Sequence, residues 1–132
     1  MGLLYTSIRV RDVKKAVAFY TKSLGMAVTD RKSYMPGETV ITLLSRDTGQ
    51  SLRLMHYEKH CRLYKPYEKG DEMDHLTFIV KDARKTYERL VAKGAPVAMQ
   101  LWEGKERTMG FVKDPDGIWI GIVSNNRGKK KK

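Results

Sequence analysis

The chain has 132 residues, 41% of them hydrophobic, which suits one compact domain and excludes a disordered chain. The formal net charge is +11, and the lysines at 129–132 supply four of these charges, so the rest of the chain still favours anionic partners. No apolar run reaches the roughly 20 residues of a membrane span and no signal-peptide pattern is present, so we expect a cytoplasmic protein without a membrane partner.

The first predicted elements are a strand and a helix. Apolar and polar residues alternate over 4–10, the pattern of a half-buried strand. Asp12 has the character of a helix N-cap, apolar residues follow it at helical spacing, and Gly25 is a plausible stop. Three strand-like segments come next, over roughly 26–34, 38–45 and 50–57, with turns at Pro36-Gly37 and 47–49.

A polar segment, 58–72, separates this set of elements from a second copy of it. The segment contains Pro66 and Gly70 and predicts a linker, and Cys61, the single cysteine, is expected to be an unremarkable thiol within it. Residues 75–82 then overlay 5–12 at an offset of 70. A helix capped by Asp82 and stopped at Gly94 follows, with strands near 95–103, 106–112 and 117–124.

The repeat predicts an α+β fold of two βαβββ modules, at about 3–57 and 73–124, within a single domain over 1–128; the lysines at 129–132 are predicted to be a disordered tail. Each helix should cover the apolar face of its sheet, and the opposite faces should line a shared cavity. Alternation along the first and last strand of each module places the following residues on the cavity side: Tyr5, Arg9, Arg53, Tyr57, His75, Trp119 and Gly121.

The turn Asp114-Pro115-Asp116-Gly117 leads into the last strand. Proline presets φ at its second position and glycine supplies a permissive backbone at its fourth. The two aspartates therefore indicate turn chemistry rather than a catalytic acid pair.

Several of these segments together resemble the vicinal oxygen chelate superfamily, which includes glyoxalase I, bleomycin resistance proteins and extradiol dioxygenases. The resemblance rests on the following segments: Tyr-Thr-Ser-Ile-Arg-Val-Arg-Asp at 5–12, Ala-Val-Ala-Phe-Tyr-Thr-Lys-Ser-Leu-Gly-Met at 16–26, Asp-His-Leu at 74–76, and Phe-Val-Lys-Asp-Pro-Asp-Gly-Ile-Trp-Ile at 111–120. It implies an incomplete eight-stranded barrel and a homodimer.

The resemblance also implies a set of metal-ligand positions. In this sequence they fall on Tyr5, Arg53, His75 and Gly121, and only His75 keeps a family-type ligand. Arg9 matches an arginine that binds a substrate carboxylate in glyoxalase I. The resemblance thus implies the fold and an anionic ligand more strongly than it implies metal-dependent chemistry.

Each candidate residue has a plainer alternative. His75 is a ligand, a general base or a satisfied wall histidine, and Arg53 binds a ligand anion or an internal carboxylate such as Glu38. Tyr5, Tyr57 and Trp119 line the cavity or simply pack. His56 and His60 have metal-type spacing, but they run from a strand end into the linker, which disfavours a metal pair.

The favoured function is binding of a small anionic organic molecule, with no cofactor. Arg9 and Arg53 would donate to the anion, and His75, Tyr5, Tyr57 and Trp119 would complete the site. One alternative is a lyase or isomerase similar to glyoxalase I, with a divalent metal. A third hypothesis is nucleic-acid binding by the basic chain, which is disfavoured because no strand face interleaves aromatic and basic residues.

Overall fold

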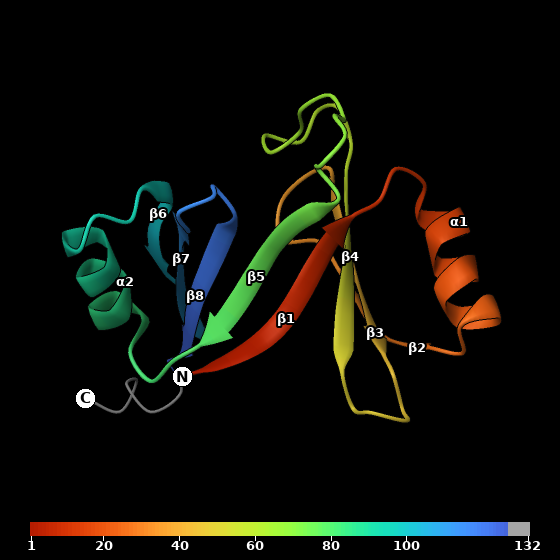
Figure 1. Ribbon diagram of the computed structural model, residues 1–132, viewed down its shortest axis with the longest axis horizontal. Coiled ribbons are helices and arrows are strands. Elements are labelled where there is room, and N and C mark those ends of the chain that lie inside the picture. The colour runs from red at the N-terminus through yellow and green to blue at the C-terminus, as the bar shows by residue number, and fades with distance from the viewer. Residues whose placement is uncertain (127–132) are drawn as a thin grey trace. The chain divides into compact units, whose positions relative to one another are not determined.

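The computed structural model describes residues 1–126, and the lysine tail predicted at 129–132 lies outside the described residues. The elements, shown in Figure 1, are β1 (Gly2–Arg9), α1 (Val13–Ala18), a π-helical turn (Phe19–Ser23), β2 (Ala27–Lys32), β3 (Glu38–Leu44), β4 (Ser51–Tyr57), β5 (Met73–Ile79), α2 (Ala83–Ala92), β6 (Val97–Glu103), β7 (Arg107–Lys113) and β8 (Trp119–Asn125). Neither helix in this described part is long and apolar enough to span a bilayer.

The strands follow the order β2-β3-β4-β1-β5-β8-β7-β6 in one eight-stranded sheet, which is not closed into a barrel. The chain divides into two compact units: an N-terminal unit, Thr6–Asp74, and a C-terminal unit made of Met1–Tyr5 and the residues from His75 onward. Within each unit the first and last strands pair in parallel and the other neighbours pair antiparallel. The predicted α+β class and the two βαβββ modules are confirmed.

In the N-terminal unit, α1 begins and ends where the sequence predicts, but its last turn is not α-helical. The Asp12 side chain accepts a hydrogen bond of 3.0 Å from the backbone N–H of Lys15, and Gly25 ends the helical segment at a φ of 75°. The chain turns into a π-helix from Phe19, where the backbone N–H of Leu24 bonds to the Phe19 carbonyl. Prediction from apolar spacing alone does not distinguish these two helix types.

The helix side of the N-terminal unit holds its main apolar core. Ile41, Leu43 and Leu54 are fully buried there. The residues that pack around them come from β1, β4, the helical segment and the chain next to these elements: Ile8, Val10, Val13, Ala16, Val17, Tyr20, Met26 and Leu52. The alternation in β1 and β4 therefore has the predicted phase, with Arg9 and Arg53 on the opposite face.

The opposite face of this unit is partly covered by the segment 58–72, which we call the connector. Cys61 is 4% exposed and packs with Val40, Met55 and Tyr57 from the sheet. Three partly buried side chains, from the connector and from the turn before β3, complete this cluster: Met35, Leu63 and Tyr64. The connector has no helix or strand, as predicted for a linker, but its central part is folded onto the sheet.

The C-terminal unit repeats the helix side with different residues. α2 packs against β6, β7 and β8, and Val80, Ala83 and Ile122 form its buried centre. The Asp82 side chain accepts from the backbone N–H of Lys85 at 3.1 Å, and the hydroxyl of buried Ser124 accepts from the N–H of Ala83 at 3.0 Å. Two of the four backbone N–H groups that lack an intrahelical acceptor at the start of α2 are thus satisfied.

The turn before β8 has the predicted chemistry. The Asp114 carboxylate accepts backbone hydrogen bonds from Asp116 at 2.8 Å and from Ile118 at 2.9 Å. Gly117 has a φ of 89° and donates to the Asp114 carbonyl at 3.0 Å. Asp114 is therefore occupied in shaping the turn.

Candidate functional site

The residues predicted to line a cavity belong to two sets, one in each unit. Arg9, Arg53 and Tyr57 lie in the N-terminal unit, and Tyr5, His75, Trp119 and Gly121 lie in the C-terminal unit. Within each unit they occupy the face opposite the helix, as alternation predicts. That one shared cavity gathers both sets stays a prediction.

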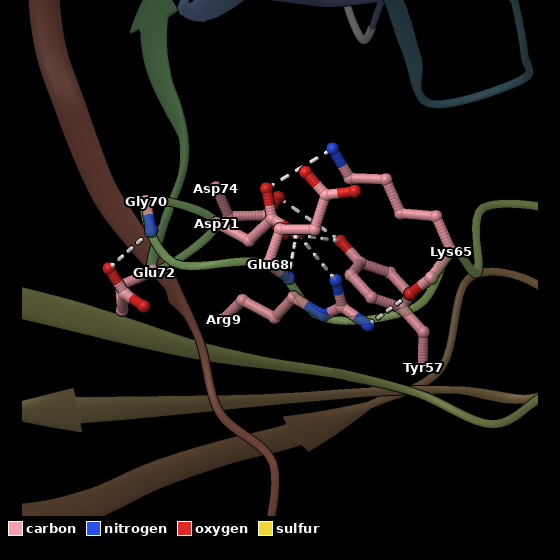
Figure 2. A network of polar contacts seen from close by, with 8 residues as sticks. All are labelled: Arg9, Tyr57, Lys65, Glu68, Gly70, Asp71, Glu72 and Asp74. Carbon is pink, nitrogen blue, oxygen red and sulfur yellow. Dashed lines mark hydrogen bonds and ion pairs between the residues drawn. The ribbon is translucent and has the colours of Figure 1, made fainter.

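Arg9 is held by the connector rather than directed at solvent (Figure 2). One guanidinium nitrogen, Nη2, donates to the backbone carbonyl of Lys65 at 2.7 Å, and Nη1 lies 3.4 Å from Oδ2 of Asp71. The Arg9 side chain is 8% exposed. Three tyrosine rings surround the guanidinium at 5.8–5.9 Å, those of Tyr57, Tyr64 and Tyr67.

These contacts give Arg9 a structural role, and its predicted role as an anion donor for a ligand stays a prediction. The guanidinium has an internal carboxylate and a backbone carbonyl within reach. Its backbone is engaged too, because the N–H of Arg9 donates to the Glu72 carbonyl at 2.8 Å. We therefore assign Arg9 to anchoring the connector on the end of β1.

Asp71 is the acceptor at the centre of this network. Its carboxylate accepts from the backbone N–H of Glu68 at 2.9 Å and pairs with the ammonium of Lys65 at 3.2 Å as well as with Arg9. The Glu68 hydrogen bond, followed by Lys65 and Arg9, holds the pKa of Asp71 below its ordinary value of 3.8. The charged form of Asp71 therefore stabilises the folded connector.

Tyr57 is tied to the end of the connector by a second carboxylate. Its hydroxyl donates to Asp74, with distances of 3.0 and 3.1 Å to the two carboxylate oxygens (Figure 2). Burial and the neighbouring Asp74 charge raise the pKa of Tyr57 far above its ordinary value of 10.0. Tyr57 is thus a neutral hydrogen-bond donor that joins β4 to the start of β5.

Arg53 lies on the same face of β4, further from the connector. Its Nε donates to the hydroxyl of Thr42 on the neighbouring strand at 3.1 Å, and Nη2 lies 3.4 Å from the Tyr34 hydroxyl. The guanidinium also stands over the Tyr34 ring at 5.9 Å. Glu38, the internal carboxylate that the sequence suggested for Arg53, accepts a hydrogen bond from the backbone N–H of Tyr34 at 3.0 Å.

In the C-terminal unit, His75 lies in an aromatic wall. It is 7% exposed, and its ring meets that of Phe111 edge-on, with centroids 5.2 Å apart and an interplanar angle of 86°. The Phe111 ring also contacts Trp119, at a centroid distance of 5.7 Å. This environment favours the wall interpretation of His75 and Trp119. Tyr5 is half-buried in β1.

Gly121 faces the same aromatic wall. A Cβ at this position would lie 3.0 Å from the Phe111 ring and 3.4 Å from the hydroxyl oxygen of Thr77. Phe111 pairs with Gly121 across β7 and β8, so its ring fills the space that a side chain at 121 would need. The glycine is therefore matched to its neighbour by size.

Metal-type donors do not converge in the described part of the chain. Within residues 1–126, no three His, Cys, Asp or Glu side chains are gathered as ligands of one ion. His56 and His60 carry the spacing noted in the sequence, and His56 lies 3.6 Å from the Glu58 carboxylate. Both histidines line a pocket where β4 ends and the connector begins.

Known proteins share this sequence pattern and this fold. A sequence model of the Glyoxalase/Bleomycin resistance protein/Dioxygenase superfamily matches residues 2–122. The chain belongs to this superfamily. Lactoylglutathione lyase of Neisseria meningitidis serogroup A is 30% identical, with 97% of this chain and 94% of that protein aligned.

Two further comparisons concern the length of the relatives and the likeness of the fold. Glyoxalase I of Saccharomyces cerevisiae is 29% identical over 95% of the chain, which spans only 45% of that longer protein. The crystal structure of methylmalonyl-CoA epimerase from Mycobacterium tuberculosis superposes with a TM-score of 0.76, covering 93% of this chain and 87% of the epimerase. Its sequence identity is 21%, so that likeness shows the fold alone.

The sequence did not predict that the connector of this superfamily member contacts two of the candidate site residues, Arg9 and Tyr57. Asp71, Asp74 and Lys65 hold Arg9 and Tyr57, but they lie in or beside a polar stretch without periodicity. The one usable signal was the excess of tyrosine at 57, 64 and 67, because aromatic residues in a polar segment often pack against a partner.

Proposed function

We propose that this protein binds a small anionic organic molecule and does so without the metal chemistry of its superfamily. The observation that carries the proposal is Arg53, a fixed cation on the sheet face opposite the helix. Its Nε is tied to Thr42 at 3.1 Å, and Tyr34 stands beside the other end of the guanidinium. A pre-oriented arginine binds carboxylates and phosphates well because less rotamer entropy is lost on binding.

The residues at the implied metal positions do not fit a divalent cation. A guanidinium at 53 repels a metal ion, and glycine at 121 has no donor atom. The Phe111 ring lies where a carboxylate at 121 would extend. His75 is the one family-type donor among them, and its ring packs edge-on against Phe111. We therefore derive no chemical step through a metal.

The proposal is tested on the ligand that the protein retains. Native mass spectrometry of the purified protein would report a bound small molecule, any metal and the oligomeric state, including the predicted homodimer. Affinity for that molecule would then be measured for the wild type, Arg53→Ala and Arg53→Lys. Loss of one charged hydrogen-bonding pair predicts a decrease of about tenfold or more for Arg53→Ala, with Arg53→Lys intermediate.

Arg46→Ala is the matched control, because it removes the same charge from an exposed turn between β3 and β4. It should bind the ligand as the wild type does. An Arg53→Ala variant with unchanged affinity would overturn the proposal. A stoichiometric divalent metal that co-purifies with the protein and is bound by His75 would overturn it as well.

A second candidate function is favoured by the relatives. The Neisseria protein, 30% identical over nearly the whole chain, is named lactoylglutathione lyase. If this chain were a lyase or isomerase of that kind, it would turn over the hemithioacetal of methylglyoxal and glutathione after Ni²⁺ or Zn²⁺ is added. Protein that stays inactive with either ion would exclude this candidate.

A further inference from the structure

A separate pocket opens in the N-terminal unit where β4 ends and the connector begins. Its volume is about 470 Å³, and its lining consists of His56, Tyr57, Glu58, Lys59, His60 and Tyr64. This volume lies within the range of roughly 300–1,000 Å³ that is usual for small-molecule pockets. Arg53 is not part of the lining; it precedes Tyr57 by four residues on β4, about 13 Å along a strand. The pocket is thus distinct from the site proposed above.

The wall of the pocket is held in place by the backbone. The N–H of Glu58 donates to the Gly37 carbonyl at 2.8 Å, and successive turns join Cys61 to Glu58 and Tyr64 to Cys61, each at 2.9 Å. Gly37 has a φ of 84°, and a Cβ there would lie 2.9 Å from the Cβ of Cys61 and 3.0 Å from Nε2 of His60. The absence of a side chain at Gly37 therefore lets the His60 ring lie directly against the backbone that precedes β3.

The lining of the pocket holds one permanent cation, Lys59, and one carboxylate, Glu58. Glu58 is the one carboxylate in the lining, and its oxygen already lies 3.6 Å from Nδ1 of His56. That leaves the ammonium of Lys59 and the imidazole of His60 as the polar groups to meet a ligand, and both side chains belong to exposed residues. With its histidines neutral the lining has no net charge, so the attraction for an anion comes from Lys59 and from the basic chain as a whole.

The remaining lining is aromatic. Tyr57 is buried, and its hydroxyl is engaged with Asp74, so the part of its side chain available to the pocket is its ring. Tyr64 is partly buried against the same cluster and contributes a second ring. Aromatic side chains favour planar ligands through stacked or edge-to-face contacts.

From this combination we propose that the pocket is a binding site for a small aromatic anion, such as an aryl carboxylate or sulfonate. The ring of the ligand would pack against Tyr57 and Tyr64, and its anionic group would meet Lys59 and His60. The inference goes beyond the proposed function, because the pocket does not include Arg53; Tyr57 is the one residue that it shares with the ligand site predicted from the sequence.

The three histidines of the chain allow a direct test. Protein labelled with ¹⁵N-histidine would be titrated with naphthalene-2-sulfonate, and the imidazole signals, assigned with His56→Gln and His60→Gln variants, would be followed by NMR. His56 and His60 line the pocket, whereas His75 belongs to the aromatic wall of the other unit and serves as an internal reference. We expect the first two signals to shift with one common Kd, and the His75 signal to stay in place.

Two comparisons make the test specific. Lys59→Ala should weaken binding of the sulfonate by about fivefold or more, whereas Lys69→Ala, which removes the same charge from an exposed connector position outside the pocket, should not. The neutral analogue 2-naphthalenemethanol should also bind more weakly than the sulfonate. Absence of shifts at His56 and His60, equal binding by the two lysine variants, or equal binding of the neutral analogue would each overturn the proposal. Because the readout excludes Arg53, failure here and failure of the proposed function are distinguishable.

Discussion

The two units share a repeat and a strand pattern, but their faces opposite the helices are built from different chemistry. In the N-terminal unit that face carries Arg9, Arg53 and Tyr57, and the connector covers part of it with paired carboxylates. In the C-terminal unit the corresponding face is an aromatic wall around His75 and Phe111. Both units keep an apolar cluster under the helix, so the same fold is compatible with different chemistry on the two opposite faces.

The largest expected effect comes from placing a carboxylate at position 121 in the C-terminal unit, where the superfamily resemblance implies a metal ligand. Gly121→Glu introduces a side chain whose Cβ lies 3.0 Å from the Phe111 ring, and it also buries a carboxylate. We expect a loss of about 3 kcal/mol in the free energy of unfolding, measured by urea denaturation.

Two further variants show whether the clash with Phe111 is the cause. In Phe111→Ala, the added cost of Gly121→Glu should be about 1–2 kcal/mol smaller than in the wild type, because the ring is gone. Gly2→Glu is the control, since nothing lies within 4 Å of a Cβ at Gly2, and it should leave stability nearly unchanged. A fully stable Gly121→Glu single variant would contradict the account of the aromatic wall.

The next effect concerns the anchor of the N-terminal face. Arg9→Ala removes a buried charged donor from the Lys65 carbonyl and from Asp71, with an expected loss of about 2 kcal/mol in unfolding free energy. Hydrogen exchange should accelerate at connector amides, above all in 64–72. Arg9→Lys keeps the charge without the planar guanidinium, so its unfolding free energy should lie between those of the wild type and Arg9→Ala. Unchanged exchange in Arg9→Ala would show that the connector is held by its apolar cluster alone.

A smaller, pH-dependent effect comes from Asp71. Its pKa is lowered in the folded protein, so its charged form stabilises the fold above the ordinary value of 3.8, and this stabilisation is lost as the pH falls below that value through the lowered pKa. Asp71→Asn should therefore flatten the acid limb of stability, seen by comparing urea midpoints near neutral pH with midpoints below about pH 3.8. Asp47→Asn, in an exposed turn, should keep the wild-type acid limb. An Asp71→Asn acid limb that matches the wild type would refute the role of this carboxylate.

The smallest effect is expected at the surface of the C-terminal unit. Arg84 on α2 pairs with Glu103 on β6, and about half of each side chain is exposed. Exposed ion pairs contribute little because solvent screens them, so Glu103→Gln should change the unfolding free energy by less than about 0.5 kcal/mol. A loss comparable to that of Arg9→Ala would remove the contrast between surface pairs and the connector network.

Most of the fold could be predicted because its signals are local and periodic. The caps at Asp12 and Asp82, the glycines at 25 and 94, and the alternation in β1, β4, β5 and β8 each state a backbone requirement within a few residues. The internal repeat then specified the two modules. The π-helical turn after Ala18 was missed, since its apolar spacing is compatible with an α-helix.

The site was predicted less completely, because its decisive contacts are long-range. Alternation placed Arg9 on the correct face but could not show that Asp71, 62 residues later, returns to pair with it. Nor could it show that Phe111 lies against Gly121, because this depends on the register of β7 and β8. Chain segments without periodicity, such as the connector, carry such contacts without a local signal.

The burial of Cys61 has a practical consequence. Cys61 is the chain's single cysteine, it is 4% exposed, and it lies in the apolar cluster where the connector packs on the sheet. A thiolate must reach solvent to be alkylated, so the rate at which an excess of iodoacetamide labels the native protein reports how often this cluster opens. The labelling rate of Cys61, measured by intact mass, thus reports the opening of the connector without any engineered probe.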